Sequence, residues 1–391
     1  MAMELSNIIF TDQDDIVPLS GMEQILNTGV ANTLAGNDRL TGNGNDDYGF
    51  RNVGTLNTDD GNDVINGYGY FLGGIINSGT FNTAEGNDII GASSGLGNGL
   101  DNIGTFNTGE GNDRITTYGY STSITNSGTF NTGEGNDTIT AGGSTSGLST
   151  SGTFNTGEGD DVITGTGRFS GISIGGIFDT GDGNDRIRGL ANRDPLHSTI
   201  GLYNTSLTFN TGDGNDTIEG KGSYRGIYNK GLINTGNGKD IIIANGGQRA
   251  GQGYSLENSF TINTGEGDDI ITSTGVIYNE GIIDTSDGDD SIVANQGFEP
   301  GSNNSGAWFL GGGDDSIKGY GSGDFYGGNG NDTLELTPGT YTVGIWGEAG
   351  ESPIFTKGNQ LMITSEFEKL KAGNTLYDFT SLTAGQIITV A

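Results

Sequence analysis

Apolar residues recur along this chain in three columns. The first column stands two residues after a repeated aspartate and comprises Leu40, Ile65, Ile90, Ile115, Ile139, Ile163, Ile187, Ile218, Ile242, Ile271, Ile292, Ile317 and Leu334. The second stands seven residues before that aspartate and begins Leu56, Phe81, Phe106, Phe130, Phe154 and Phe178. The third stands six residues earlier, as in Phe50, Ile75, Leu100 and Ile124. Gly, Asn, Asp and Ser separate the columns, which indicates short strands joined by tight turns.

The aspartate recurs at intervals of mostly 24 or 25 residues. Its copies are Asp38, Asp63, Asp88, Asp113, Asp137, Asp161, Asp185, Asp216, Asp240, Asp269, Asp290, Asp315 and Asp332. A period of this length is typical of one turn of a solenoid. We therefore predict an all-β fold, a parallel β-solenoid of about 13 coils similar to a β-helix or β-roll. Right-handed coiling is expected, because parallel crossovers are almost always right-handed.

The repeat divides the chain into four segments. We expect a cap at residues 1–31, the solenoid of 24–25-residue coils at 32–308, tandem nine-residue units at 309–335 and a second cap at 336–391. Caps are expected because an unpaired sheet edge at either end would pair with other chains.

Two further features are interpreted as structural. Two coils carry insertions, residues 188–200 and 244–255, which are predicted to bulge from one corner and leave the strands in register. A column of asparagines stands four residues before the second apolar column and comprises Asn52, Asn77, Asn102, Asn126, Asn229, Asn258 and Asn279. We interpret it as a ladder of amides that hydrogen-bond from coil to coil.

Composition narrows the possible functions. The 391 residues carry a formal charge of −33 at pH 7, with 16 Lys and Arg against 49 Asp and Glu. This balance argues against a nucleic-acid partner, because binding phosphates depends on basic residues. The chain has no Cys, which excludes disulfides and thiolate metal sites. It also has no run of about 18 apolar residues, so no transmembrane helix is expected.

The aspartate column creates an electrostatic problem. Equivalent residues of successive coils would stack about 4.8 Å apart. Ionised carboxylates at that distance repel by about 1 kcal/mol per pair in water and by about 3.5 kcal/mol at an effective dielectric of 20. Summed over the column, this repulsion rivals the roughly 5–15 kcal/mol stability of a domain. A cation from outside the chain is therefore predicted. Calcium fits, since it accepts six to eight oxygen ligands in flexible geometry, whereas magnesium demands rigid geometry and zinc prefers Cys and His.

Two stretches resemble a known calcium-binding repeat. Residues 327–335, GGNGNDTLE, match in full the pattern G-G-x-G-x-D-x-U-x of the RTX, or haemolysin-type, repeat, and residues 132–140, TGEGNDTIT, depart from it only in the first Thr. Over residues 32–335 the chain is similar to RTX proteins, and its recurring NTGEGND motif looks most like that of cyanobacterial surface proteins. The resemblance implies that the thirteen column aspartates, with turn carbonyls, bind multiple Ca²⁺ ions. We also predict Asp324, in the tandem units, as a ligand.

The chain departs from RTX repeats in one respect. RTX β-rolls set two such units back to back in each coil, so that calcium lies along both edges. Most coils here carry one unit and a longer segment, so we expect metal along a single edge. In the copy NTGNGKD, Lys239 stands beside Asp240 and is expected to weaken that site.

The leading functional hypothesis is a secreted, calcium-binding structural protein of the cell surface or extracellular matrix, such as a sheath, surface layer or fibril. It would fold on binding Ca²⁺. The resemblance implies type I secretion with an uncleaved C-terminal signal in residues 336–391, and the amino terminus has no Sec-type signal pattern. The partners would be calcium and either further copies of the chain, end to end or laterally, or a surface polysaccharide.

Two other functions stay open. The alternative is a protein that binds or modifies polysaccharide, but no catalytic residues are expected, because the single histidine, His197, lies in an insertion. Ice binding through regular Thr and Asn columns ranks lower. The acidic residues Glu110, Glu134 and Glu158 are expected to interrupt a flat, weakly charged face.

Overall fold

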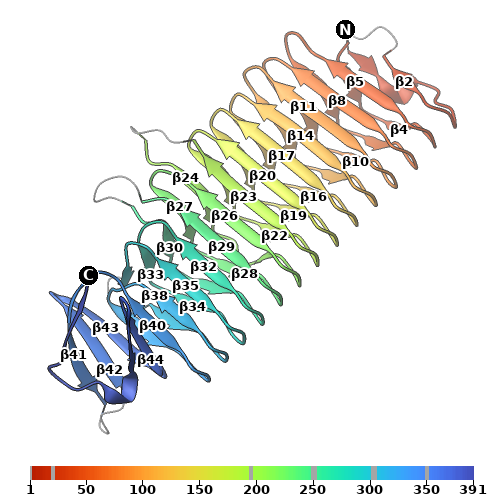
Figure 1. Cartoon of the computed structure of the whole chain (residues 1–391). Coiled ribbons are helices and arrows are strands. Elements are labelled where there is room, and N and C mark those ends of the chain that lie inside the picture. Colours follow the sequence, from red (N-terminus) through yellow and green to blue (C-terminus); the bar gives the residue numbers. More distant parts are fainter. Residues whose placement is uncertain (1, 19–22, 193–196, 248–252, 301–305, 348–351) are drawn as a thin grey trace.

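The computed structural model describes residues 2–18, 23–192, 197–247, 253–300, 306–347 and 352–391. The chain coils into a long rod of about 12 turns in which three parallel sheets run side by side (Figure 1). The predicted parallel β-solenoid is thus confirmed. Helix is confined, in the described residues, to two short 3-10 turns, η1 (Leu5–Asn7) and η2 (Phe379–Ser381), and neither is long enough to cross a membrane.

Each coil contributes one strand to each sheet. Sheet A comprises β1 (Met3–Glu4), β3 (Ile25–Asn27), β6 (Tyr48–Asn52), β9 (Gly73–Asn77), β12 (Asn98–Asn102), β15 (Thr122–Asn126), β18 (Ser146–Thr150), β21 (Ser170–Ile174), β24 (Ile200–Asn204), β27 (Arg225–Asn229), β30 (Leu256–Asn258), β33 (Ile277–Asn279) and β36 (Phe298–Pro300).

Sheet B follows the aspartate turns. It comprises β2 (Ile16–Val17), β5 (Arg39–Asn43), β8 (Val64–Gly69), β11 (Ile89–Ser94), β14 (Arg114–Gly119), β17 (Thr138–Gly143), β20 (Val162–Gly167), β23 (Arg186–Ala191), β26 (Thr217–Lys221), β29 (Ile241–Asn245), β32 (Ile270–Ser273), β35 (Ser291–Ala294), β38 (Ser316–Lys318), β40 (Thr333–Leu336), β44 (Lys369–Ala372) and β45 (Thr375–Asp378).

Sheet C precedes the aspartate turns. It comprises β4 (Val30–Asn32), β7 (Thr55–Asn57), β10 (Thr80–Asn82), β13 (Thr105–Asn107), β16 (Thr129–Asn131), β19 (Thr153–Asn155), β22 (Ile177–Asp179), β25 (Phe209–Asn210), β28 (Leu232–Asn234), β31 (Thr261–Asn263), β34 (Ile282–Asp284), β37 (Ala307–Phe309), β39 (Gly323–Tyr326), β41 (Gly339–Trp346), β42 (Ser352–Lys357), β43 (Gln360–Ser365) and β46 (Ile387–Val390).

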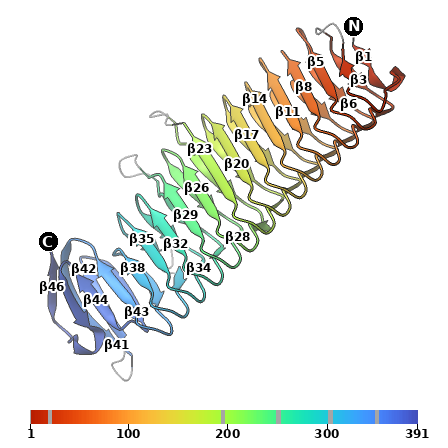
Figure 2. The same cartoon turned by 45° about the vertical axis from the view of Figure 1, so that its right-hand side comes forward.

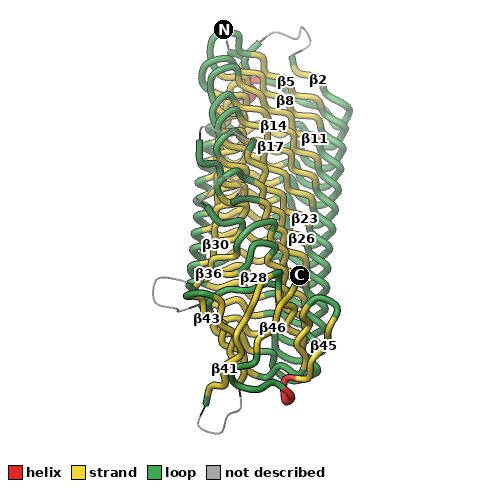
Figure 3. The backbone as a smooth tube through the Cα atoms, turned by 60° about the vertical axis from the view of Figure 1, so that its left-hand side comes forward, coloured by secondary structure: helices red, strands yellow, loops and turns green. Residues whose placement is uncertain are grey.

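The three apolar columns form the core inside the coil. Each sheet is in register, so that Ile115 pairs with Ile139 in sheet B and Phe106 pairs with Phe130 in sheet C. All three columns are buried. From Phe81 to Phe178, successive phenylalanine rings stack with centroids 4.5–5.1 Å apart and planes within 13°. The strands and turns therefore align in rows along the rod (Figure 3).

The predicted asparagine ladder is present at a buried corner. The Asn52 Nδ2 donates to the Asn77 Oδ1 at 2.8 Å and to the Thr80 carbonyl at 2.7 Å, and equivalent bonds recur from coil to coil. Asn27 and Asn204 also belong to it. Inner members such as Asn52 and Asn77 use both the donor and the acceptor of their amides within the rod, whereas Oδ1 of Asn27, at the start of the ladder, is buried without a partner.

The ends of the chain continue the three sheets. Within residues 1–31, β1 pairs with β3 and β2 pairs with β5, both parallel, so this segment already contains coil strands. Within residues 336–391, β43 and β44 add in parallel to β39 and β40 of the last coil. The pairs β41–β42, β41–β46 and β44–β45 are antiparallel and cover that end of the rod (Figure 2).

The two insertions leave the same corner, between sheets B and A. The first lies between β23 and β24 and the second between β29 and β30, and both following strands rejoin sheet A in register. Residues 193–196 and 248–252 of these insertions lie outside the described residues.

Candidate metal centre

The repeated aspartate ends a six-residue turn that joins sheet C to sheet B. In residues 132–137, Gly133 and Gly135 have φ of 97° and 134°, which favour glycine. A Cβ on Gly133 would overlap the carbonyl oxygen of Gly109 in the preceding coil, and Gly135 meets Gly111 in the same way. Glycine therefore lets the turns stack closely, with their carbonyl oxygens directed along the rod.

The column aspartates form one continuous hydrogen-bonded ladder. The backbone N–H of Asp113 donates to Oδ1 of Asp137 at 2.7 Å, and the N–H of Asp137 donates to Oδ1 of Asp161 at 2.8 Å. The same bond, at 2.7–2.9 Å, joins every neighbouring pair from Asp38 to Asp332. The structure thus brings all thirteen predicted aspartates of the repeat into one row.

The ladder extends further than the sequence indicated. The Asp15 N–H donates to Oδ1 of Asp38 at 2.8 Å, and the Asp332 N–H donates to Oε2 of Glu368 at 2.7 Å. Residues 14–17, Asp-Asp-Ile-Val, are a degenerate copy of the repeat, because Val17 stands two places after Asp15 and pairs with Leu40 of the first apolar column, and this spacing is a signal for Asp15. Glu368 lies in the segment without repeats, where the period gives no signal.

Asp324, the fourteenth predicted ligand, is not part of the row. It lies on β39 of sheet C, where it pairs with Ala307. The row lies at the start of the sheet B strands instead. The sequence GSGDFYG resembles the repeat, but its Asp enters a strand of a different sheet.

In twelve of the thirteen column aspartates the second carboxylate oxygen accepts no hydrogen bond of good geometry, although a threonine of the same turn lowers the pKa of the carboxyl group in the copies from Asp38 to Asp290. Oδ2 is buried and unpaired in Asp38, Asp63, Asp88, Asp113, Asp137, Asp161, Asp185, Asp240, Asp269, Asp290, Asp315 and Asp332. In Asp216 it accepts from the Thr211 hydroxyl. An ionised oxygen buried without a partner is costly, because its hydration is lost and nothing replaces it. The row therefore requires either protons or a cation.

Burial accordingly raises the pKa of these carboxyl groups. Loss of hydration is the largest cause throughout, and it raises the pKa of Asp161, Asp216 and Asp290 to about 8. The pKa rises to about 7 in Asp63, Asp88, Asp113, Asp185, Asp269 and Asp315, and to about 6 in Asp137, Asp240 and Asp332. At Asp161 the hydroxyl of Thr156 opposes the shift most and the backbone N–H of Asp137 opposes it next, whereas the negative charges of Asp137 and Asp185 add to it.

The donor set suits calcium better than zinc. In the described part of the chain, no three His, Cys, Asp or Glu side chains come together as a metal site. A cation between two coils would therefore take the unpaired oxygens of two column aspartates and complete its shell with turn carbonyls and water. Calcium accepts such mixed oxygen ligands in flexible geometry. When bound, it would supply the positive charge that the row lacks.

A second acidic column follows the outside of the same turns. Glu85, Glu110, Glu134, Glu158 and Asp182 line a shallow groove together with glycines of the turns. These residues lie in the turns between the strands of sheets C and B. The Thr column of sheet C is interrupted by apolar residues, since Ile177 and Leu232 occupy its place in later coils.

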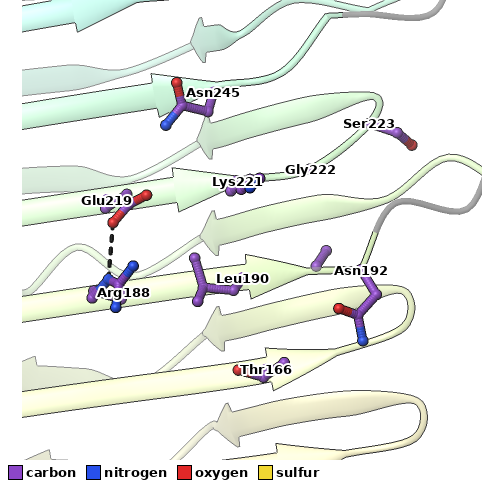
Figure 4. Close-up of a pocket in the computed structure, with 10 residues that line it drawn as sticks. Thr166, Arg188, Leu190, Asn192, Glu219, Lys221, Gly222, Ser223 and Asn245 are labelled. Carbon is purple, nitrogen blue, oxygen red and sulfur yellow. Dashed lines mark hydrogen bonds and ion pairs between the residues drawn. The ribbon is translucent and has the colours of Figure 1, made fainter.

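A hollow outside this row lies on sheet B (Figure 4). Arg188 Nε and Glu219 Oε2 form an ion pair there at 2.9 Å, beside Lys221 and Asn245. Glycoside hydrolysis ordinarily needs two carboxyl groups, and Glu219 is the one carboxylate among the residues that line this hollow. His197 is exposed and packs edge-on against Phe169.

The raised pKa values predict an unusual pH dependence for metal-free protein. A carboxyl group whose pKa is raised from 3.8 to between about 6 and 8 on folding stabilises the fold below pH 4, and this contribution is lost as pH rises through 6 to 8. The melting temperature of the metal-free protein should therefore decrease from pH 4 to pH 8. In excess Ca²⁺ the melting temperature should instead decrease as the pH drops, because protons compete with the metal. A metal-free melting temperature that does not change with pH would contradict this account of the row.

Comparison with known proteins does not assign the chain to a family. No protein-family model matches the chain, and neither a curated protein nor a solved structure matches it. Function is therefore inferred from the row of aspartates itself, and the resemblance to RTX repeats stays a prediction.

Proposed function

We propose that this chain is a calcium-binding structural protein whose rod folds when Ca²⁺ neutralises the aspartate row. The observation that supports the proposal most is the series of buried, unpaired Oδ2 atoms at successive coils. A cation that takes oxygens from two neighbouring coils joins those coils. Because such a site does not exist in the unfolded chain, the free energy of binding becomes free energy of folding.

The buried asparagine ladder sharpens this proposal. At that corner the chain uses a neutral side chain to link coils, and amides such as Asn52 and Asn77 satisfy both of their polar atoms. At the turn corner, Oδ1 of Asp137 accepts a coil-to-coil bond from the backbone N–H of Asp113, which an asparagine oxygen could also accept. The negative charge of aspartate is therefore not needed for the hydrogen bonds between coils. It is needed only if the row binds a cation.

The proposal includes a location outside the cell or at its surface, reached by type I secretion. Extracellular modules bind calcium at roughly 10⁻⁴–10⁻³ M, so a rod of this kind would stay unfolded where calcium is scarce. The formal charge of −33 favours the unfolded chain when no cation is present, because the charges repel one another in a compact state. On this proposal the partners are Ca²⁺ and, at the surface, further copies of the chain or a polysaccharide.

Calcium removal tests the proposal directly. At pH 7.5 in a chelator, the far-ultraviolet circular dichroism should lose its β signal, and the signal should return when Ca²⁺ is added in excess. Mg²⁺ at equal concentration should not restore it, because magnesium demands near-ideal octahedral geometry. A metal-free protein with the same spectrum and melting temperature as the calcium-loaded one would refute the proposal.

Replacement of a single column residue separates a metal site from a hydrogen-bonded ladder. Asp137→Asn keeps an oxygen that accepts from the Asp113 N–H. It removes a buried charge and the oxygen that would bind the cations between this coil and the coils before and after it. We expect weaker calcium binding and, in calcium, faster hydrogen exchange between residues 113 and 161. In metal-free protein the same variant should be more stable than the parent.

The matched control is Glu134→Gln, which removes an exposed carboxylate from the same turn. It should leave local exchange in calcium nearly unchanged. If Asp137→Asn destabilised the protein equally with and without calcium, the row would be a ladder that requires no metal.

A further inference from the structure

One stretch of sheet A departs from the uniform outer surface of the rod. A single outward-facing column runs along this sheet, and its register is Arg51, Ile76, Asp101, Thr125, Ser149, Ser173, Tyr203, Tyr228, Glu257, Tyr278 and Glu299. Small residues such as Ser149 and Ser173 fill it in the middle of the rod. The coil therefore does not need aromatic residues at this position.

The tyrosines of this column flank a hollow. Tyr228 and Tyr278 belong to coils two apart, about 9.6 Å along the rod at the usual strand spacing, and Glu257 lies between them. The Tyr203 ring stacks on Tyr228 with centroids 5.1 Å apart. On the other side Tyr254, at the end of the second insertion, stacks on Tyr278 with centroids 4.5 Å apart and planes within 17°.

We define the tyrosine patch as Tyr228, Lys230, Tyr254, Glu257 and Tyr278, which line this hollow with Ser259 and Glu280. The three rings are half-buried, whereas Glu257 is buried at the base. An insertion and a substituted column thus build one site from three successive coils.

The polar groups of the patch are already held in place. The buried Glu257 carboxylate accepts a hydrogen bond from Arg225 Nε. The Arg225 guanidinium lies 4.2 Å from the centroids of both the Tyr224 and Tyr228 rings. The Lys230 ammonium lies 5.0 Å from the Tyr228 centroid, and the Tyr278 hydroxyl donates to Glu280. A ligand would therefore meet a preorganised surface and not a set of mobile side chains.

The chemistry of this surface fits an uncharged saccharide. Half-exposed tyrosine rings offer apolar faces and edges, and Lys230, Ser259 and Glu280 place donors and acceptors around them. A sugar ring combines C–H surfaces with hydroxyl groups that both donate and accept. Arg225 and Lys230 already occupy the cation-binding positions of Tyr228, which disfavours a cationic ligand. Glu257, Glu280 and the formal charge of −33 disfavour an anionic one.

We propose that the tyrosine patch is a binding site for a segment of a neutral polysaccharide. The site lies on the side of the rod, so a long chain can reach it without entering a closed pocket. This inference does not depend on the metal proposal, although the protein should be tested in calcium so that it is folded if that proposal holds.

Affinity electrophoresis of the full chain tests this proposal. Native gels containing Ca²⁺ are cast with galactomannan, xyloglucan or hydroxyethyl cellulose as neutral probes, or with alginate as an acidic probe. We expect retardation in at least one neutral gel and none in alginate. The double variant Tyr228→Ala/Tyr278→Ala should lose that retardation while its circular dichroism in calcium matches the parent.

The matched control is Tyr118→Ala/Tyr120→Ala, which removes two tyrosines that are 54% and 56% exposed elsewhere on the rod. This variant should migrate as the parent does in every gel. Absence of retardation in all neutral gels, retardation in alginate alone, or equal loss in both double variants would each overturn the proposal. If the Tyr228→Ala/Tyr278→Ala protein proved unfolded, Tyr254→Ala, at the end of the insertion, would test the same site.

Discussion

Burial of a carboxylate at every coil is the constraint on which the rest of this rod depends. The turn that carries each aspartate leaves a backbone N–H at the start of a sheet B strand, and Oδ1 of the next coil accepts it. That arrangement buries Oδ2 as well, in a row with its neighbours. The glycines of the turn enforce the close stacking, because a side chain at Gly133 would overlap the coil before it. A cation bound along this row would convert the main electrostatic weakness of the fold into its principal link between coils.

Much of this fold could be predicted because a solenoid converts sequence period directly into spatial register. The apolar residue two places after each aspartate, for example Ile139, lies where the period places it, and the asparagine ladder through Asn52 and Asn77 also forms as expected. Prediction failed where the period fails. Glu368 joins the ladder from a segment without repeats, and Asp324 has a similar local sequence but enters a different sheet.

The tyrosine patch could not be predicted for a related reason. Its residues come from coils of unequal length, and the intervals around it are 29 and 21 residues, so Tyr228 and Tyr278 do not share an obvious spacing. They come together only when the strands are aligned in the sheet. Tyr254 belongs to an insertion that has no counterpart in other coils. The regular part of the repeat thus builds the rod, and the departures from it carry the individual features of this chain.

The position of bound calcium is the most direct test of the central claim. Crystals grown in Ca²⁺ and measured at a wavelength with strong anomalous scattering from calcium would locate every ordered ion. We predict one row of ions along the turns between sheets C and B, with each ion against Oδ2 of two successive column aspartates. A folded, calcium-soaked rod without ions in that row, or with ions only at the other two corners, would contradict the account.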